Sequence, residues 1–434
     1  MEHTPIQHDT AEGRSAPMAA AWDRGRVGLW LIGARGSVAT TVAVGVHALA
    51  AHVAPPTGCT TAGPGFDDVP LPGFDEIVIG GHDVSTVPLG HRAEQLAATG
   101  MIPGAIVAAV RAELDATDAE IRPAPTAAPD AGQADVIARI ASDIAAFRER
   151  HGLAHVTVID VSSTEPLPAD RPEFHDAELL AAALADPEQA VLPASSLAAL
   201  AAVEAGAAYA CFTPSAGLAL PALREIAGSR IAFAGQDGKT GETLLRTVLA
   251  PMFVERGMRV LSWAGANLLG GGDGQTLADP EAVRSKLASK TRGLQSLVGD
   301  HVVAPLHIDN VPDLGDVKTA WDHVHAEGFL SSRITLQTTW TAYDSMLAAP
   351  LVIDLARLLS LAGAADVRGV VPALGCFFKD PWGSEVHAFA DQVAALRSWS
   401  SDLGEQLAAQ PAARPADAAG PEATTDPVPI GAVR

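Results

Sequence analysis

Short apolar runs alternate with helical stretches along the first 250 residues of the chain. The first run, VGLWLIG, stops at a glycine, and the stretch GSVATTVAVGVHALAAHV that follows it has a helical pattern. This alternation is typical of a parallel, doubly wound sheet. The predicted strands cover residues 27–33, 75–81, 156–163, 208–214 and 230–238, and the predicted helices cover 36–53, 104–121, 132–151, 197–207 and 216–227, with a loop at 121–133.

The pattern changes near residue 250, where spacings lengthen and charged positions become more frequent. We therefore predict an α+β domain inserted into the first one, with strands at 259–267, 301–309 and 332–340. A helix at 348–362 and a strand with a helix at 368–400 are expected to return to the first sheet. The predicted divisions are a disordered leader (1–24), a first domain (25–249, completed by 360–400), the inserted domain (250–359) and a disordered tail (401–434).

Composition narrows the class of protein. The hydrophobic fraction of 48% permits a large core, and no stretch reaches the roughly 18 uncharged apolar residues that a membrane helix needs. The polar start does not resemble a signal peptide, so a cytoplasmic location is expected. Three distant cysteines argue against a disulfide scaffold or a zinc cluster. A net charge of −22 disfavours nucleic acid and anionic membranes as partners, so an anionic substrate would need locally concentrated cations.

The turn LIGARGSVATT follows a strand and opens a helix. Such a turn points backbone N–H groups and a helix N-terminus at an anion, which suits a dinucleotide pyrophosphate. Only Gly33 and Gly36 match, in a G-x-x-G-S form, so an ordinary strand-to-helix turn is the alternative. Asp83, after the next strand, is a candidate to hold a ribose diol, and a helix N-cap is its equally plausible role.

The segment GQDGKTGET has only a superficial likeness to a Walker A loop. Phe233 stands where that motif requires its first glycine, which makes a GTPase or kinase a weak prediction. The segment nevertheless opens a helix after a strand, so a second phosphate could bind there. Glu242 is an awkward neighbour for a phosphate because like charges repel.

Lysine is scarce in this chain, so the positions of the lysines are informative. Lys286 and Lys290 are four residues apart and share a helix face just after the glycine-rich turn NLLGGGDGQTL. Lys318 follows in GDVK, and Lys379 ends the apolar, strand-like run GCFFK. A solvated basic face is the alternative, but partly buried lysines can act as acid–base groups or stabilise an enolate. No histidine pair has metal-ligand spacing, and no G-x-S-x-G elbow is present.

Eight blocks of sequence follow one another in order: GARGSVATT, GGHDVS, LPASSLAALAAVEAGAAY, GQDGKTGETLLRTVL, NLLGGGDGQTL, RSKLASK, GDVKTAWD and YDSMLAAPLVIDL. Together they resemble the myo-inositol-1-phosphate synthase (inositol-3-phosphate synthase) family of NAD-dependent sugar-phosphate cyclases. The resemblance extends from about residue 27 to about residue 395. It implies an α/β fold with a Rossmann-type doubly wound parallel sheet and an inserted α+β catalytic and oligomerisation domain, bound NAD, and a homo-oligomer such as a tetramer.

The family reaction implied by this resemblance begins with hydride transfer from C5 of glucose 6-phosphate to NAD. The ketone acidifies the C6 protons, the enolate attacks the C1 aldehyde, and NADH reduces C5 again to give an inositol phosphate. Such chemistry needs a dinucleotide site, a phosphate cradle, and cations where enolate and alkoxide charge develops. A lysine cluster supplies those cations without a divalent metal.

Matched position by position, the resemblance assigns catalytic roles to Lys286, Lys290, Lys318, Lys379, Asp237 and Asp273, and it assigns no metal ligand. Lys290 and Lys318 are expected beside the phosphate, and Lys286 and Lys379 beside the C5 oxygen and the reacting carbons. The implied NAD-binding residues are Gly33, Ala34, Arg35, Gly36, Ser37, Val38, Asp83, Ser162, Ser163, Thr164, Asp237 and Asp344. The implied substrate-binding residues are Thr240, Gly241 and Thr243 around the phosphate, with Glu242, Asn267, Gly271 and Asp316.

The chain departs from the family pattern at three places near the substrate. Residues 270–274 are GGGDG instead of G-N-N-D-G, Glu242 replaces a glutamine, and TTWTAY (338–343) lacks a histidine–asparagine pair. Lost hydrogen bonds to substrate hydroxyls change specificity strongly. Glucose 6-phosphate is the substrate that the family resemblance implies. Because of the three departures, fructose 6-phosphate closing to a cyclopentane phosphate, as in carbocyclic nucleoside pathways, is the alternative. A simple NAD-dependent dehydrogenase and a non-catalytic NAD-binding protein are the further hypotheses.

Overall fold

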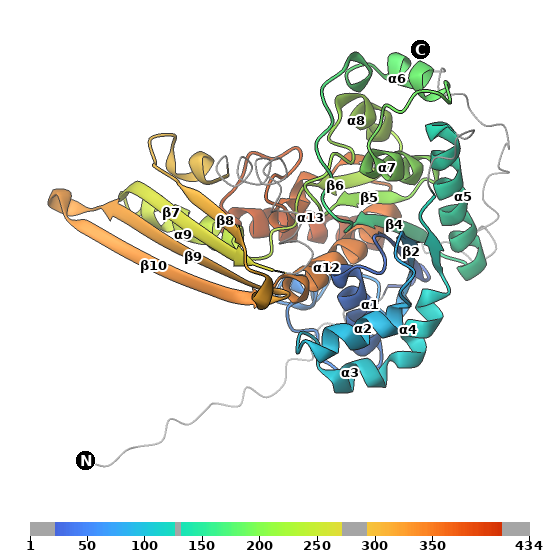
Figure 1. The fold of residues 1–434 in the computed structure, drawn as a ribbon, viewed down its shortest axis with the longest axis horizontal. Coiled ribbons are helices and arrows are strands. Elements are labelled where there is room, and N and C mark those ends of the chain that lie inside the picture. Colours follow the sequence, from blue (N-terminus) through green and yellow to red (C-terminus); the bar gives the residue numbers. More distant parts are fainter. Residues whose placement is uncertain (1–21, 126–131, 271–292, 410–434) are drawn as a thin grey trace.

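The computed structural model describes residues 22–125, 132–270 and 293–409, and it contains two sheets (Figure 1). The larger sheet is parallel throughout, in the order β11-β6-β5-β4-β1-β2-β3. Apart from β11, this is the strand order of doubly wound dinucleotide-binding folds, which reverses direction beside β1. Its strands are β1 (Val27–Ile32), β2 (Ile77–Asp83), β3 (Ile121–Pro123), β4 (His155–Asp160), β5 (Ala208–Cys211), β6 (Ala232–Gly235) and β11 (Gly369–Val370).

Helices cover both faces of this sheet, which explains why its strands are nearly continuous apolar runs. In β1, Leu29 and Leu31 belong to one core cluster and Trp30 belongs to the other, as the two-residue period of a strand requires. Helices α1 (Ser37–Ala50), α2 (Leu89–Ala98), α3 (Gly104–Ala109) and α4 (Arg111–Asp118) lie on the first face, and α5 (Gln133–His151), α6 (Ala177–Leu184), α7 (Ala194–Glu204) and α8 (Pro221–Gly228) lie on the second.

The second sheet is mixed and extends away from the first, to the left in Figure 1. Its order is β10-β9-β7-β8, and only the β7–β8 pair is parallel. Helix α9 packs against one face through Phe253, which meets Trp263 and Val324 in a separate small core. The elements are α9 (Glu242–Glu255), β7 (Arg259–Leu269), β8 (Leu306–Asn310), β9 (Val317–Glu327) and β10 (Arg333–Tyr343).

Helix α12 (Asp344–Ala364) carries the chain from β10 back into the first domain, where it packs against α1. It is the one helix of the described ranges that is long and apolar enough to cross a membrane, but 72% of its apolar window is buried inside the protein. A short 3-10 helix (Pro372–Phe377) and α13 (Phe389–Ala409) complete the fold. The predicted domain boundary at 359/360 falls within α12, and the proposed boundaries remain a proposal.

The structure confirms the fold class and the five strands predicted for the first sheet. The helix predicted at 104–121 is wrong, because the backbone at Val110 leaves helical geometry and separates α3 from α4. The loop predicted at 121–133 begins with the edge strand β3. The strand-like run ending at Lys379 is mostly 3-10 helix.

Candidate active site

The glycine-rich turn after β1 forms the first part of the site. Gly33 adopts φ +84°, and a Cβ there would lie 2.8 Å from the Cα of Ser162, so a side chain would not fit. The N–H groups of Gly33 and Ala34 donate to the carbonyl of His82 (2.9 and 3.1 Å). Gly36 is the N-cap of α1 and provides no side-chain cap, so the first-turn amides at Ser37 and Val38 remain available to an anion.

Asp83 lies at the carboxyl end of β2, beside this turn. Its carboxylate accepts the backbone N–H groups of Arg35 and Ser85, both at 2.6 Å. Helix α2 begins later, with Pro88 at its N-cap, so the alternative role of Asp83 as a helix N-cap is wrong. The Arg35 side chain donates to Asp118 (2.8 Å) and therefore ties the turn to α4. This position of Asp83 is where dinucleotide-binding folds hold a ribose diol.

The end of β4 supplies the opposite wall of the turn. Asp160 is completely buried, and it accepts the N–H (3.0 Å) and Oγ–H (2.6 Å) of Ser162. Burial raises the pKa of Asp160 to about 6. Ser163 is exposed and Thr164 is half-buried, just beyond the strand. Gly33 and Ser162 thus meet between β1 and β4, where the strand order reverses and ligands bind in such sheets. The turn, Asp83 and this crevice fit a dinucleotide.

Asp237 and Lys379 form a buried ion pair beyond β6. Their charged atoms are 2.8 Å apart, and their side chains are 8% and 9% exposed. The pair forms because residues 237–239 and 377–379 lie side by side: Lys379 N–H donates to the Asp237 carbonyl, and Lys239 N–H donates to the Phe377 carbonyl. The second carboxylate oxygen of Asp237 is buried without a hydrogen-bond partner among the described residues. It can therefore accept a hydrogen bond from a ligand.

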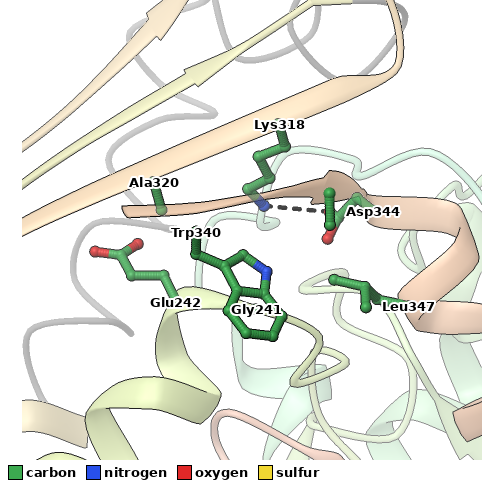
Figure 2. Close-up of a pocket in the computed structure, with 8 residues that line it drawn as sticks. Gly241, Glu242, Lys318, Ala320, Trp340, Asp344 and Leu347 are labelled. Carbon is green, nitrogen blue, oxygen red and sulfur yellow. Dashed lines mark hydrogen bonds and ion pairs between the residues drawn. The ribbon is translucent and has the colours of Figure 1, made fainter. Parts of the chain in front are cut away.

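A small pocket lies between the start of α9, strands β9 and β10, and the start of α12 (Figure 2). Asp344, at the start of α12, accepts the hydroxyl of Thr240 (2.6 Å) and the ammonium of Lys318 (3.2 Å). The register of β9 and β10 sets Lys318 opposite Ala342 and Ala320 opposite Trp340, so all four side chains share one face of the sheet. The pocket is lined by Gly241, Glu242, Lys318, Ala320, Trp340, Ala342, Asp344 and Leu347.

Glu242, predicted to bind substrate, lies in a buried charge network. Its carboxylate pairs with Arg246 and accepts the Nδ2–H of Asn267 (2.7 Å). Arg246 also binds Asp322 (2.9 Å), and burial raises the pKa of Asp322. A Cβ on Gly265 would lie 2.7 Å from the Arg246 guanidinium, so a glycine leaves room for the network. Glu242 is thus turned toward a cation, which weakens the repulsion that the sequence suggested for a phosphate.

The remaining predicted residues fall into two groups. Asp316 is half-buried directly before β9, next to Gly315, against which Gly270 packs just after the end of β7. Gly271, Asp273, Lys286 and Lys290 lie outside the described residues, so their roles stay predictions. Within the described ranges, no three His, Cys, Asp or Glu side chains are grouped as metal ligands.

Two residues at the site were missed by sequence reasoning. Trp340 lines the pocket, and only the β9–β10 register reveals that position. Lys239 is buried, and its ammonium donates to Gln392 on α13. The scarcity of lysine was an available signal for it, because the chain has only five lysines and all lie between residues 239 and 379.

Comparisons with known proteins agree with this geometry. The profile of the family described as myo-inositol-1-phosphate synthase matches residues 27–400. Inositol-3-phosphate synthase 1 of Bacteroides thetaiotaomicron is 28% identical over 403 residues, which cover 85% of this chain and 91% of that protein. The Drosophila melanogaster inositol-3-phosphate synthase is 31% identical over 243 residues, 53% of this chain but only 42% of its own length.

The fold is also similar to a solved structure. The crystal structure of inositol-3-phosphate synthase from Caenorhabditis elegans superimposes with a TM-score of 0.77 and 23% identity, covering 91% of this chain and 90% of that one. At this identity the match supports the architecture: a parallel dinucleotide-binding sheet joined to a mixed sheet.

Proposed function

The chain belongs to the myo-inositol-1-phosphate synthase family, and on that premise we propose that it cyclises glucose 6-phosphate to an inositol phosphate. It is an isomerase-type enzyme with NAD as its cofactor. NAD, when bound, supplies reversible hydride transfer at C5, so the overall reaction needs no external oxidant. The chain's own residues must then bind the sugar phosphate, hold NAD against it and manage the protons.

The first-domain residues are proposed to hold NAD. The uncapped first turn of α1, with Gly33 and Gly36 before it, suits the pyrophosphate because its amides point out of the helix. The Asp83 carboxylate suits the ribose hydroxyls as a hydrogen-bond acceptor. Ser162 lies across the turn from Gly33, within the crevice proposed for the nicotinamide half.

Lys379 and Asp237 are proposed to act on the reacting carbons. The Lys379 ammonium stabilises negative charge on the C5 oxygen as the enolate develops, and a buried site strengthens that interaction. The unpartnered oxygen of Asp237 accepts a hydrogen bond from a substrate hydroxyl. Thr240, Gly241, Thr243 and Lys318 surround the phosphate. By resemblance alone, Lys290 is assigned to the phosphate and Lys286 to the C5 oxygen and the reacting carbons.

The buried Asp237–Lys379 pair is the observation that carries this proposal, and Lys379→Met tests it. Full-length enzyme, NAD and labelled glucose 6-phosphate are followed by phosphorus and carbon NMR. Wild type is expected to yield a cyclic phosphate without net NADH, and Lys379→Met to be roughly 100- to 1000-fold slower. Arg368→Met, which removes an exposed cation far from the pair, serves as the control. Stoichiometric NADH with no cyclic product would instead indicate a simple dehydrogenase.

Fructose 6-phosphate closing to a cyclopentane phosphate is a second candidate. The observation in its favour is Trp340, a bulky indole in the pocket wall, within the segment that lacks the family's histidine–asparagine pair. Competition between the two sugars in one NMR tube decides between them, since each gives a distinct ring.

We also propose a cytoplasmic homo-oligomer, a tetramer by family resemblance. The face of the mixed sheet opposite α9 supports it, because that face carries the exposed Trp321. Light scattering should give a mass near four times the 44.5 kDa chain. A mass of one chain would exclude this assembly.

A further inference from the structure

The Trp340 indole N–H is a buried donor without an acceptor. Its Nε1 has no hydrogen-bond partner within the described ranges and almost no solvent exposure. Figure 2 shows this nitrogen turned toward the space between Lys318, Asp344 and Leu347. Buried tryptophan N–H groups usually have a partner, because a buried donor without an acceptor destabilises the fold. The position therefore calls for an acceptor from a ligand.

The neighbouring groups are also donors. A Cβ on Gly241 would lie 3.4 Å from Trp340 Nε1, so the indole nitrogen sits beside the N-cap of α9. That helix has no side-chain cap among the described residues. Thr243, in its first turn, is only 6% exposed, and its hydroxyl has no partner in the described part of the chain. Uncapped amides, a hydroxyl and an indole N–H together favour an anionic oxygen.

The two carboxylates of the pocket do not oppose an anion. Asp344 is engaged by the Thr240 hydroxyl and the Lys318 ammonium. Glu242 is engaged by Arg246 and Asn267, on the side of the mixed sheet. Both carboxylates are thus engaged by cations, but Arg246 is shared with Asp322, so the uncapped amides and the two unpartnered donors, and not a net positive charge, are what favour an anion here.

We propose that Trp340 is a phosphate-binding residue, whose indole N–H donates to a non-bridging oxygen of the substrate phosphate at the start of α9. The proposal rests on the proposed function for the identity of the sugar, but the recognition of phosphate follows from the pocket. A neutral donor with a single N–H direction fixes the rotation of the phosphate without adding charge. Ala320, which is paired with Trp340 on β9, is small and leaves space for the indole.

Calorimetric titration of the full-length protein with inorganic phosphate, and with glucose 6-phosphate in the absence of added NAD, tests this proposal. Trp340→Phe removes the N–H and keeps an aromatic ring, and it should weaken both ligands by the same factor, about tenfold. Trp340→His restores a ring donor and should recover part of the loss. Trp22→Phe is the matched control, because the Trp22 indole N–H donates to the Gly25 carbonyl, and Trp22 is not one of the residues that line the pocket.

Each outcome decides the matter. Unchanged phosphate affinity in Trp340→Phe overturns the proposal, and so does a loss confined to glucose 6-phosphate, which would place the N–H against the sugar. Absence of phosphate binding to wild type also overturns it. If Trp340→Phe has a lowered melting temperature, the phosphate affinity of Trp340→His is compared with that of wild type instead. Phosphate binding that depends on Trp340 in an enzyme that cyclises no sugar would leave this inference standing and refute the proposed function.

Discussion

The few lysines of this chain lie at different places from most of its arginines, and they have different acid–base properties. Only five of its 29 basic residues are lysines, and the three that the structure describes lie at the candidate site. Lys318 and Lys379 pair with carboxylates. Arginine is always charged, whereas a buried ammonium can lose its proton, so the two cations are not interchangeable at a site that manages protons.

Lys239 provides a pH-dependent prediction at this scale. Burial lowers the pKa of its ammonium to about 8, and its neighbours are Gln392 and the Phe389 ring. An unfolded lysine titrates near 10.4, so between these values the unfolded state holds the additional proton and the free energy of unfolding rises with pH. Relative to Lys239→Met, wild type should gain about 2 kcal/mol from pH 7.5 to pH 10.

Urea unfolding of both proteins at several pH values measures this difference. Cys376 and His387, whose pKa values Lys239 lowers, titrate above and below this pH range, and groups that do not interact with Lys239 cancel in the comparison. A difference that is independent of pH, or one that falls as pH rises, would show that the Lys239 ammonium keeps its ordinary proton affinity in the fold.

Sequence reasoning identified residues better than their partners. Thr240 and Lys318 are predicted beside the phosphate and Asp344 at NAD, whereas the structure places Asp344 against Thr240 and Lys318. The partner of Glu242 was not foreseen, because the Arg246 and Asn267 contacts depend on how α9 lies on β7. The local sequence pattern shows residue types and their spacing, but it does not show how α9 packs on β7.

At the scale of elements, α9, β7 and β9 are joined by a buried charge network. Arg246 lies between Glu242 and Asp322, and Trp263 and Asn267 donate to these carboxylates (both 2.7 Å). Removing one member of a buried ion network leaves charge uncompensated, which costs roughly 3–5 kcal/mol. Arg246→Met should therefore lower the free energy of unfolding by that amount in urea titrations.

A triple variant separates charge from packing in this network. Adding Glu242→Gln and Asp322→Asn to Arg246→Met removes both buried charges, and it should recover most of the lost stability. Glutamine is the residue that the family pattern has at position 242. If the triple variant is no more stable than Arg246→Met alone, the arginine stabilises the fold through its packing and not through its charge.

The five strands in the middle of the first sheet were predictable and β9 was not, for a physical reason. Strands covered on both faces are continuous apolar runs, and such runs are visible in sequence. Strand β9 reads VKTAWDHVHAE, with a buried carboxylate at Asp322 and an outward face of Thr319, Trp321 and His323. Its alternation is obscured because Asp322 is buried by Arg246 and Trp263, which come from other elements.

At the scale of the whole molecule, α12 joins the two halves of the site. Its first residue, Asp344, contacts Lys318 of the mixed sheet. Further along, Asp354 accepts the N–H groups of Thr60 (2.6 Å) and Thr61 (3.1 Å), which fixes a loop of the first domain to the same helix. The predicted return of the chain to the first sheet is thus made by α12, whose residues Asp344 and Leu347 also line the proposed phosphate pocket. Ligand binding at the NAD crevice or at the pocket should therefore change the stability of both domains, because α12 connects them.

Cofactor binding gives a prediction for this connected structure. NAD at 100 times its dissociation constant should add about 2.7 kcal/mol to the free energy of unfolding and raise the melting temperature. NADP should not, because its 2′-phosphate would meet the Asp83 carboxylate, which Arg35 and Ser85 N–H groups hold in place. Asp83→Asn removes the negative charge and keeps a side chain of similar size. It should therefore reduce the difference between the melting temperatures measured with NAD and with NADP. Equal stabilisation of wild type by NAD and NADP would mean that the ribose lies elsewhere, and Asp83 would then serve only to order the turn.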